Sequence, residues 1–239
     1  MSFVDDVERN GFAVVPDLLA ADAHTALLPA FEGAFGRGGR RDGLAIEAVR
    51  AAAAAPAVRR VVEAILGRDA VVTKATLFDK TPAANWLVPW HQDTTIALRE
   101  RRECPGFGPW SCKDGVTHVR PPRFVLDGML AVRLDLDGAT QGAGSLRVLA
   151  GTHRNGLLDS EEIQRLRRAQ PATLCAVPAR GALVLRPLLL HASSKAMMAE
   201  PEASLASRAT RRRVVHLEFA NVRLPEGVHW HEWWPTPSP

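Results

Sequence analysis

The sequence contains few cysteines, and no two of them have the spacing of a metal-binding or redox pair. Its 239 residues include only Cys104, Cys112 and Cys175. An odd number with no Cys-x-x-Cys spacing argues against a disulfide framework and against a thiolate zinc site. The first residues, MSFVDDVERNG, are acidic and do not resemble a signal peptide. We therefore expect the protein to occupy a reducing, cytoplasmic compartment.

Two further absences narrow the range of partners. No apolar run approaches the length of a membrane span, so we expect no membrane association. The formal net charge of +4 is modest, and the basic residues form no dense stripe of the kind that binds nucleic acid. The small basic excess instead points weakly to a small-molecule substrate that is anionic. No feature of the sequence indicates an oligomeric state.

The remaining composition is that of an ordinary globular protein, with 46% hydrophobic and 23% charged residues. The length suits a single domain over residues 1–239. Helical patterns come first and strand patterns follow, without the regular alternation of a doubly wound fold. We predict a mainly β fold with flanking α-helices: a double-stranded β-helix of the jelly-roll, cupin-like kind, with the N-terminal helices packed outside.

Capping residues and prolines mark the ends of the predicted helices. Ser2 and Gly11 cap the first helix, Pro56 should divide the third, and Asp159 begins the last with a capping box. We predict helices over residues 2–10, 20–35, 44–67 and 160–169. Strand patterns cover residues 12–15, 69–78, 86–98, 129–137, 144–149, 172–177, 181–191 and 212–220.

The segment ANWLVPWHQDTTIAL places a histidine and an aspartate two residues apart among apolar side chains. In a strand, residues i and i+2 project from the same face, so His91 and Asp93 would point toward one place. The pair alone fits a structural hydrogen bond as well as a metal site, which needs a further ligand. Of the eight histidines, His191 is the best placed, because it ends the apolar run LVLRPLLLH and precedes small polar residues.

His91, Asp93 and His191 would together offer two imidazoles and one carboxylate. This set occupies one face of an octahedral ion and leaves three positions open, which is the arrangement of non-haem Fe(II) oxygenases. Three open positions suit a bidentate cosubstrate together with O₂. The residues therefore favour Fe(II) as the metal, and a cosubstrate such as 2-oxoglutarate would chelate it through its keto acid end and leave the third position to O₂.

A 2-oxoglutarate molecule would need a cation for the carboxylate that lies far from the metal, ideally an arginine with its bidentate fork. In the run TRRRVVHLEFA, alternation places Arg212, His216 and Glu218 on one face. The opposite face, with Leu217 and Phe219, is more apolar and should pack under helices. We therefore predict that Arg212 is the inward-facing arginine.

Residues Arg99 to Arg123 form a long segment with glycine, proline and charge but little periodicity. Long structureless loops in compact domains are usually functional, and this one directly follows the His-Gln-Asp segment. We predict a lid loop over residues 99–125. Within it, Trp110, His118 and Arg120 are candidates for substrate contact, with an ordinary lid surface as the alternative. Asn85 and Lys80 are weaker candidates for lining the cosubstrate pocket.

Four segments, WHQD, GSLRVLAGTHRNG, LLLHASS and RRVVHLEFA, resemble the phytanoyl-CoA dioxygenase-like branch of the Fe(II)/2-oxoglutarate oxygenases. The resemblance runs from GFAVVPDLL to about Ala220. It implies that His91, Asp93 and His191 bind iron. It also implies that Arg212 pairs with the distal carboxylate of 2-oxoglutarate, with help from Ser193.

The activity that the resemblance implies is oxidation of a small organic metabolite, with release of succinate and CO₂. Because related halogenases replace the carboxylate ligand with a small residue, the presence of Asp93 favours a hydroxylase. Two features depart from the family pattern. Ala150 stands where proline is common, and the segment between His191 and Arg212 is longer than usual, which makes Arg208 and Arg211 rivals of Arg212.

Two other functions remain open at the level of sequence. One is a metal-dependent cupin-type enzyme that does not use 2-oxoglutarate, in which Arg212 would have no cosubstrate role. The other is a non-catalytic jelly-roll binding protein with a vestigial metal site. The joint presence of the three ligands and an inward arginine favours the oxygenase.

Overall fold

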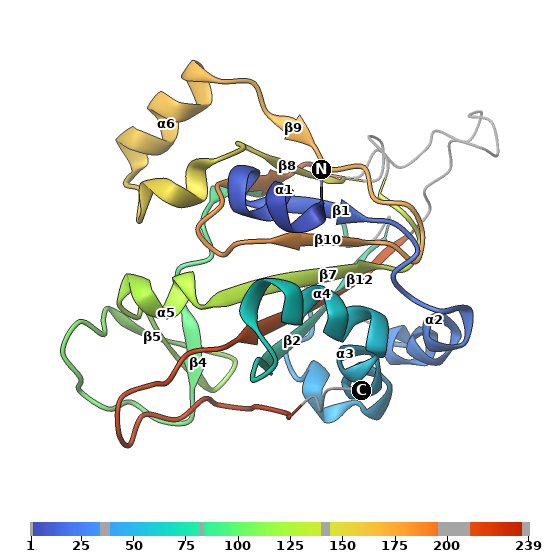
Figure 1. The fold of residues 1–239 in the computed structure, drawn as a ribbon, viewed down its shortest axis with the longest axis horizontal. Coiled ribbons are helices and arrows are strands. Elements are labelled where there is room, and N and C mark those ends of the chain that lie inside the picture. The colour runs from blue at the N-terminus through green and yellow to red at the C-terminus, as the bar shows by residue number, and fades with distance from the viewer. Residues whose placement is uncertain (1, 34–38, 82–83, 140–143, 196–210, 236–239) are drawn as a thin grey trace.

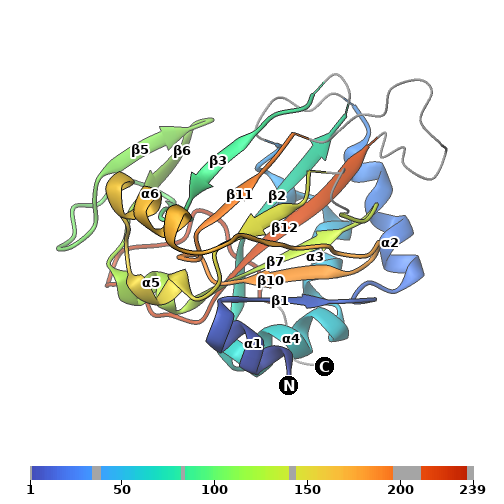
Figure 2. The ribbon, with the colours of Figure 1, turned by 90° about the horizontal axis from the view of Figure 1, so that it is seen from above.

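The computed structural model describes residues 2–33, 39–81, 84–139, 144–195 and 211–235. Within these residues the strands form three antiparallel sheets, and helices cover one side of the longest sheet (Figures 1 and 2). The architecture is the predicted double-stranded β-helix with helices packed outside.

The five-stranded sheet consists of β1 (Phe12–Val15), β2 (Val71–Lys80), β7 (Met129–Asp135), β10 (Ala182–Leu185) and β12 (Arg212–Ala220), in the order β1-β10-β7-β12-β2. The four-stranded sheet consists of β3 (Val88–His91), β8 (Leu146–Val148), β9 (Thr173–Leu174) and β11 (His191–Ser193), in the order β3-β11-β8-β9. A third sheet holds β4 (Ile96–Leu98), β5 (Trp110–Lys113) and β6 (Val116–Val119), in the order β4-β6-β5.

The helices begin and end largely where the local signals place them. They are α1 (Phe3–Asn10), α2 (Ala21–Leu27), α3 (Glu47–Ala54), α4 (Pro56–Leu66), α5 (Arg123–Asp127) and α6 (Ser160–Ala169). Short 3₁₀ helices are η1 (Leu28–Phe31), η2 (Gly43–Ala45) and η4 (Thr152–Asn155). None of the helices in the described residues has the length and apolar character that a membrane crossing requires.

Capping explains these boundaries. Ser2 and Asp5 form a reciprocal capping box at the start of α1, and Gly11 ends that helix with a φ of +83°. Pro56 opens α4 as its first residue, so it divides the predicted helix into α3 and α4. The helix predicted over 20–35 is shorter, because α2 ends at Leu27 and passes into η1; residues 34 and 35 lie outside the described residues.

The main hydrophobic core lies between the five-stranded sheet and helices α1 to α4. The apolar face of β12 contributes Val215, Leu217 and Phe219, each fully buried, so the prediction that this face packs under helices is confirmed. The opposite face of β12 therefore points toward the four-stranded sheet. In Figures 1 and 2 the four N-terminal helices lie together on one side of the sheet, whereas α6 lies apart from them.

Two of the predicted strands are each divided in the structure. Residues 86–98 form β3 and β4, which belong to different sheets. Residues 181–191 form β10 and the start of β11, also in different sheets. Pro187 lies in the connection, where the missing N–H does not interrupt a ladder. The prediction that His191 ends a strand is wrong, because it begins β11.

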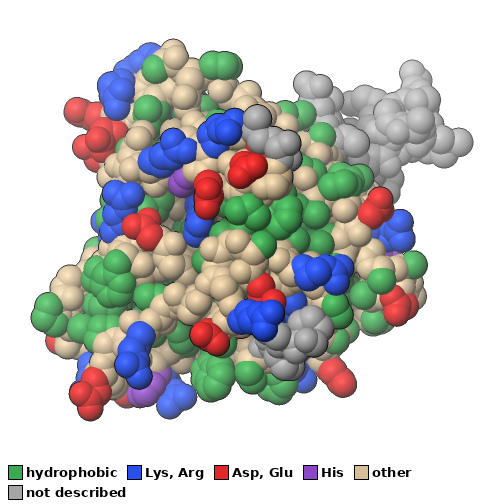
Figure 3. All heavy atoms as spheres, in the orientation of Figure 1, with side chains coloured by type: hydrophobic (Ala, Val, Ile, Leu, Met, Phe, Trp, Pro, Cys, Tyr) green, Lys and Arg blue, Asp and Glu red, His purple; other side chains and the backbone are tan. Residues whose placement is uncertain are grey.

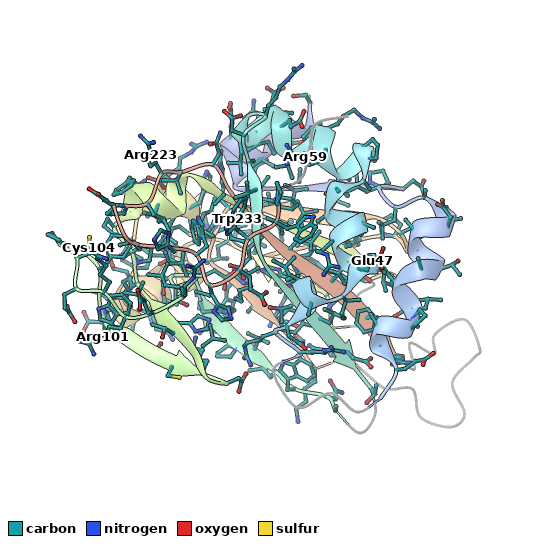
Figure 4. All side chains as sticks on the ribbon, turned by 90° about the horizontal axis from the view of Figure 1, so that it is seen from below. Glu47, Arg59, Arg101, Cys104, Arg223 and Trp233 are labelled. Carbon is teal, nitrogen blue, oxygen red and sulfur yellow. The ribbon has the colours of Figure 1, made fainter. Side chains whose placement is uncertain are left out.

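The segment predicted as a structureless lid is also different in the structure. Residues 110–119 form a β-hairpin, β5 and β6, which pairs with β4, and α5 follows it. Figure 4 shows Arg101 and Cys104 in the connection before this hairpin, on the side of the molecule away from Glu47 of α3. The sequence of residues 110–119 shows little alternation of apolar and polar residues. This agrees with the structure, in which β5 has no buried residue and only the last two residues of β6 are buried.

Candidate metal and cosubstrate site

A cavity of about 500 Å³ lies between the two larger sheets, and the predicted ligands His91, Asp93 and His191 line it. Each of these three side chains offers one atom that could bind a metal, and the three atoms all lie within 4.8 Å of one another. His91 and His191 are paired across β3 and β11, and their ring centroids are 4.2 Å apart. The structure therefore brings together the three residues that the sequence proposes as ligands.

The two histidines are oriented by their own backbones. The Nδ1 atom of His91 lies 2.8 Å from the carbonyl oxygen of Pro89, and that of His191 lies 2.8 Å from the carbonyl of Leu189. A carbonyl accepts only, so each Nδ1 carries the proton and donates it. Each Nε2 is then left with a free lone pair, which is the form of imidazole that binds metals.

Both lone pairs face the same carboxylate. His91 Nε2 lies 3.7 Å from Asp93 Oδ1, and His191 Nε2 lies 3.8 Å from Oδ2. These separations are too long for good hydrogen bonds but allow the three groups to share one ion. Burial lowers the pKa of His191 to about 4, so this ring stays neutral near pH 7. The donor set fits a divalent ion with two nitrogen ligands and one oxygen ligand.

Asp93 occupies its position for a reason that strand alternation does not supply. β3 ends at His91, so the prediction that both ligands share a strand face is wrong in detail. The backbone N–H of Asp93 instead donates to the carbonyl of Pro187 at 2.9 Å, which fixes the residue beside the start of β11. Burial raises the pKa of the Asp93 carboxyl, but attraction by His191, His216 and His91 outweighs it and lowers the pKa below its usual value.

Gln92, between the two ligands, points away from them and is buried. Its amide nitrogen donates to the carbonyls of Gly156 at 2.8 Å and Leu188 at 2.7 Å. Its oxygen accepts from the Leu158 N–H at 2.9 Å. The side chain therefore ties the segment that carries His91 and Asp93 to the segment that leads into His191.

Beyond the ligands, a group of cations and hydroxyls lines the same cavity. Lys80 Nζ donates to Ser193 Oγ at 2.7 Å and to the Ser194 carbonyl at 2.8 Å. Arg212 faces Lys80 across the β12–β2 ladder. Burial, followed by repulsion from Arg212 and Arg133, lowers the pKa of Lys80 to about 8. Both predicted cosubstrate residues, Arg212 and Ser193, thus lie in one cluster with Lys80.

Arg212 already has a partner inside the protein. Its Nε and Nη2 donate to Asp135 Oδ2 at 3.1 and 2.8 Å, and its Nη1 donates to the Gly144 carbonyl at 2.8 Å. The rival Arg211 points elsewhere, to Asp79 and the Phe31 carbonyl, and does not line the cavity. Arg208, the other rival, lies outside the described residues.

A second polar chain lies in the cavity at the level of the ligands. Lys74 Nζ contacts Glu218 Oε1 at 2.7 Å, and the His216 Nε2 lies 3.6 Å from the same oxygen. Burial raises the pKa of the Glu218 carboxyl, but Lys74 and His216 outweigh it, so the pKa lies well below its usual range. Glu218 is therefore ionised and held by Lys74.

The three candidates for substrate contact lie in different places. His118 is buried in β6 and lines the cavity, with its Nδ1 3.1 Å from the Val116 carbonyl. Trp110 packs instead in the hydrophobic cluster under the third sheet, and Arg120 is exposed; neither lines the cavity. Lys113 of β5 does line it. The lid role predicted for residues 99–125 stays a prediction.

Two residues that line the cavity, Lys80 and Arg133, have only a weak signal in the sequence. Lys80 follows from the alternation of β2, and Arg133 lies on the face of residues 129–137 opposite Val132 and Leu134. Both signals were present in the strand pattern. Neither could be connected to the ligands before the order of the strands was known. Asn85, the other weak candidate, does not line the cavity.

Comparisons with known proteins concern the family and the fold. The model of the phytanoyl-CoA dioxygenase family matches residues 7–200. No protein with a curated description matches the sequence. AviO1 from Streptomyces viridochromogenes Tue57 superposes with a TM-score of 0.63 at 19% identity, over 93% of this chain and 95% of that one. The non-heme α-ketoglutarate-dependent epimerase SnoN of nogalamycin biosynthesis has a TM-score of 0.63 at 16% identity, over 92% and 79%.

EctD from S. alaskensis, in its apo form, is also similar, with a TM-score of 0.63 at 16% identity over 91% of this chain and 75% of that one. At these identities the similarity concerns the fold. It covers nearly the whole chain, so the helices and the sheets both belong to the shared architecture.

Proposed function

The chain belongs to the phytanoyl-CoA dioxygenase family, and from that premise we propose that it is an Fe(II)- and 2-oxoglutarate-dependent oxygenase. The substrate is a small organic molecule, and the reaction is a hydroxylation with release of succinate and CO₂. The observation that carries the proposal is the convergence of His91, Asp93 and His191 in one cavity with a cation cluster.

The three ligands would hold the iron, and their second contacts support that role. Each histidine has its Nδ1 proton fixed on a carbonyl, which sets the ring plane and leaves Nε2 for the metal. Asp93 supplies a negative charge that partly offsets the charge of the ion. Iron bound together with 2-oxoglutarate supplies the activation of O₂, and the carboxylate ligand favours hydroxylation over halogenation.

The distal carboxylate of 2-oxoglutarate would lie among Ser193, Lys80 and Arg212. Because Asp135 already takes the fork of Arg212, this arginine contributes charge and its remaining N–H groups rather than an unoccupied fork. Lys80, whose hydrogen-bond acceptors among the described residues are the uncharged oxygens of Ser193 and Ser194, is then the main counter-charge. Ser193 donates its proton to the Gly144 carbonyl and accepts from Lys80, so it would act by positioning the ammonium group of Lys80 beside the carboxylate.

The test is an anaerobic titration of the protein with Fe(II) and then 2-oxoglutarate, followed through the weak visible charge-transfer band of the chelate. Wild type should show the band, and His91→Ala should not. Arg212→Ala should need about 10- to 100-fold more 2-oxoglutarate, since a hydrogen bond to a charged group contributes about 1.5–3 kcal/mol. Lys80→Met should show at least as large an effect.

Arg213→Ala is the matched control. Arg213 also pairs with an aspartate, Asp137, and adjoins Arg212 on β12, but it does not line the cavity. Its 2-oxoglutarate requirement should equal that of wild type. Stoichiometric metal without a band would eliminate this function. It would favour a cupin-type enzyme without 2-oxoglutarate, or a binding protein with a vestigial metal site.

A further inference from the structure

Three consecutive arginines at the start of β12 use the same edge of the guanidinium for carboxylates. Arg211, Arg212 and Arg213 each place Nε and Nη2, the two donors of the side-on fork, on an aspartate. The partners of this set are Asp79, Asp135 and Asp137. The side-on fork is the geometry that matches a planar carboxylate.

Arg133 in β7 differs from these three, because no carboxylate among the described residues accepts from it. Its Nη1 lies 3.0 Å from His216 Nδ1, and its Cζ lies 5.2 Å from the ring centre of Phe78. These two rings hold the guanidinium from different directions. Its Nε is buried and has no hydrogen-bond partner in the part of the chain that the structure describes. Since Arg133 lines the cavity, this cation lies at the wall of a space that a ligand can enter.

Asp93 and Asp135 attract the charge of Arg133, but no carboxylate of the described residues forms an ion pair with it. The lining includes two carboxylates, Asp93 and Glu218, and six basic side chains, which are Arg41, Lys74, Lys80, Lys113, Arg133 and Arg212. Asp114, Glu218 and Asp135 pair with Arg41, Lys74 and Arg212. Asp93 serves the metal, and one distal carboxylate from 2-oxoglutarate offsets Lys80. Of the six basic side chains, Arg133 and Lys113 of the β5–β6 hairpin are then left without an ion-pair partner among the described residues.

The strand register separates Arg133 from the position of the distal carboxylate. Arg212 is opposite Lys80, whereas Arg133 is opposite His216. His216 is four residues beyond Arg212, or about 13 Å along the strand at about 3.3 Å per residue. His216 is also near enough to Asp93 to affect its ionisation. The backbone of Arg133 therefore lies at the level of the metal ligands, while its guanidinium reaches Phe78 and is near enough to Lys80 and Arg212 to repel both cations.

We propose that Arg133 binds a carboxylate of the organic substrate, so that the substrate is a small organic acid held beside the metal by this guanidinium. This inference rests on the proposed function, because it needs 2-oxoglutarate to occupy the other cation cluster. A carboxylate has two sources here, the substrate and 2-oxoglutarate itself, and the experiment below separates them. Phe78 and Trp86 also line the cavity and provide apolar surface for the rest of the molecule.

The experiment uses benzoate as the probe acid and benzamide as its uncharged counterpart. Wild-type protein is loaded anaerobically with Fe(II) and saturating 2-oxoglutarate, and the charge-transfer band is recorded. Binding of each probe is then measured by calorimetry while the band is monitored for displacement of 2-oxoglutarate. The variants are Arg133→Gln, which keeps an N–H for His216, and Arg133→Met.

Wild type should bind benzoate more tightly than benzamide without losing the band. Arg133→Gln should weaken benzoate binding about 10- to 100-fold, the loss expected for a charge-assisted contact, and should leave the 2-oxoglutarate requirement within about twofold of wild type. Arg147→Met is the matched control. Arg147 also has a buried Nε without a partner among the described residues, but it stacks near Trp90 and does not line the cavity.

Three results would overturn the proposal. Equal binding of benzoate and benzamide by wild type would show that the cavity does not select a carboxylate. Unchanged benzoate binding in both Arg133 variants would remove Arg133 from that role. An increased 2-oxoglutarate requirement in Arg133→Gln, with benzoate unaffected, would assign this arginine to the cosubstrate. Absence of the band in wild type would instead contradict the proposed function itself, so the two failures are distinguishable.

Discussion

Replacing Gln92 with leucine tests whether this side chain holds the two ligand-bearing segments together. Leucine has a similar size but loses all three buried hydrogen bonds to Gly156, Leu158 and Leu188. At about 1 kcal/mol for each bond, the free energy of unfolding should fall by about 3 kcal/mol. For a domain of this length, that corresponds to a decrease in Tm of roughly 6–12 °C, at about 2–4 °C per kcal/mol.

The assay is thermal unfolding followed by circular dichroism, with and without Zn(II) as a redox-inert metal. Loosening of both segments should also weaken Zn(II) binding roughly tenfold, the lower end of what changes around metal ligands cause. Gln164→Leu in α6 is the control, because Gln164 is exposed and its substitution should change stability by less than about 0.5 kcal/mol. A Tm within 2 °C of wild type for Gln92→Leu, with unchanged Zn(II) affinity, would refute the reasoning.

Three further outcomes are expected. The pKa of Lys80 is about 8, and a bound carboxylate raises it, so 2-oxoglutarate affinity should be constant below pH 8 and fall above it. Calorimetry in two buffers should detect proton uptake on binding above pH 8. The Lys80→Met variant should show no such proton uptake. Arg59→Met should lower the free energy of unfolding in urea by about 3 kcal/mol without changing 2-oxoglutarate binding, since buried Arg59 donates to Ala70, Arg68 and Glu63. Zn(II) at 100 times its Kd should stabilise wild type by about 2.7 kcal/mol, and His191→Ala should show no such gain by thermal unfolding.

The local parts of the fold could be predicted because their causes are local. The N-cap at Ser2, the capping box at Asp159 and the division of the helices at Pro56 depend on a few adjacent residues, and the structure has all three. The two faces of β12 follow from alternation alone. The hairpin of residues 110–119 could not be predicted in this way, because its pairing with β4 depends on a distant contact rather than on its own pattern.

Surface charge likewise follows from composition only in general terms. Figure 3 shows basic and acidic side chains interspersed on the face that it displays. The excess of positive charge that matters is inside, where basic side chains from several segments line one cavity. Composition could suggest an anionic ligand but could not place it.

The sequence by itself determined which side chains could bind a metal and which face of β12 would carry Arg212, because strand alternation and residue chemistry are properties of short segments. Only the tertiary structure decided that Asp93 enters the candidate metal site from beyond β3, that Asp135 occupies the fork of Arg212, and that Lys80 and Arg133 line the same cavity. These relations depend on the register of strands far apart in the chain. That register is set by the packing of the whole core and by buried charge pairs, so no local pattern contains it.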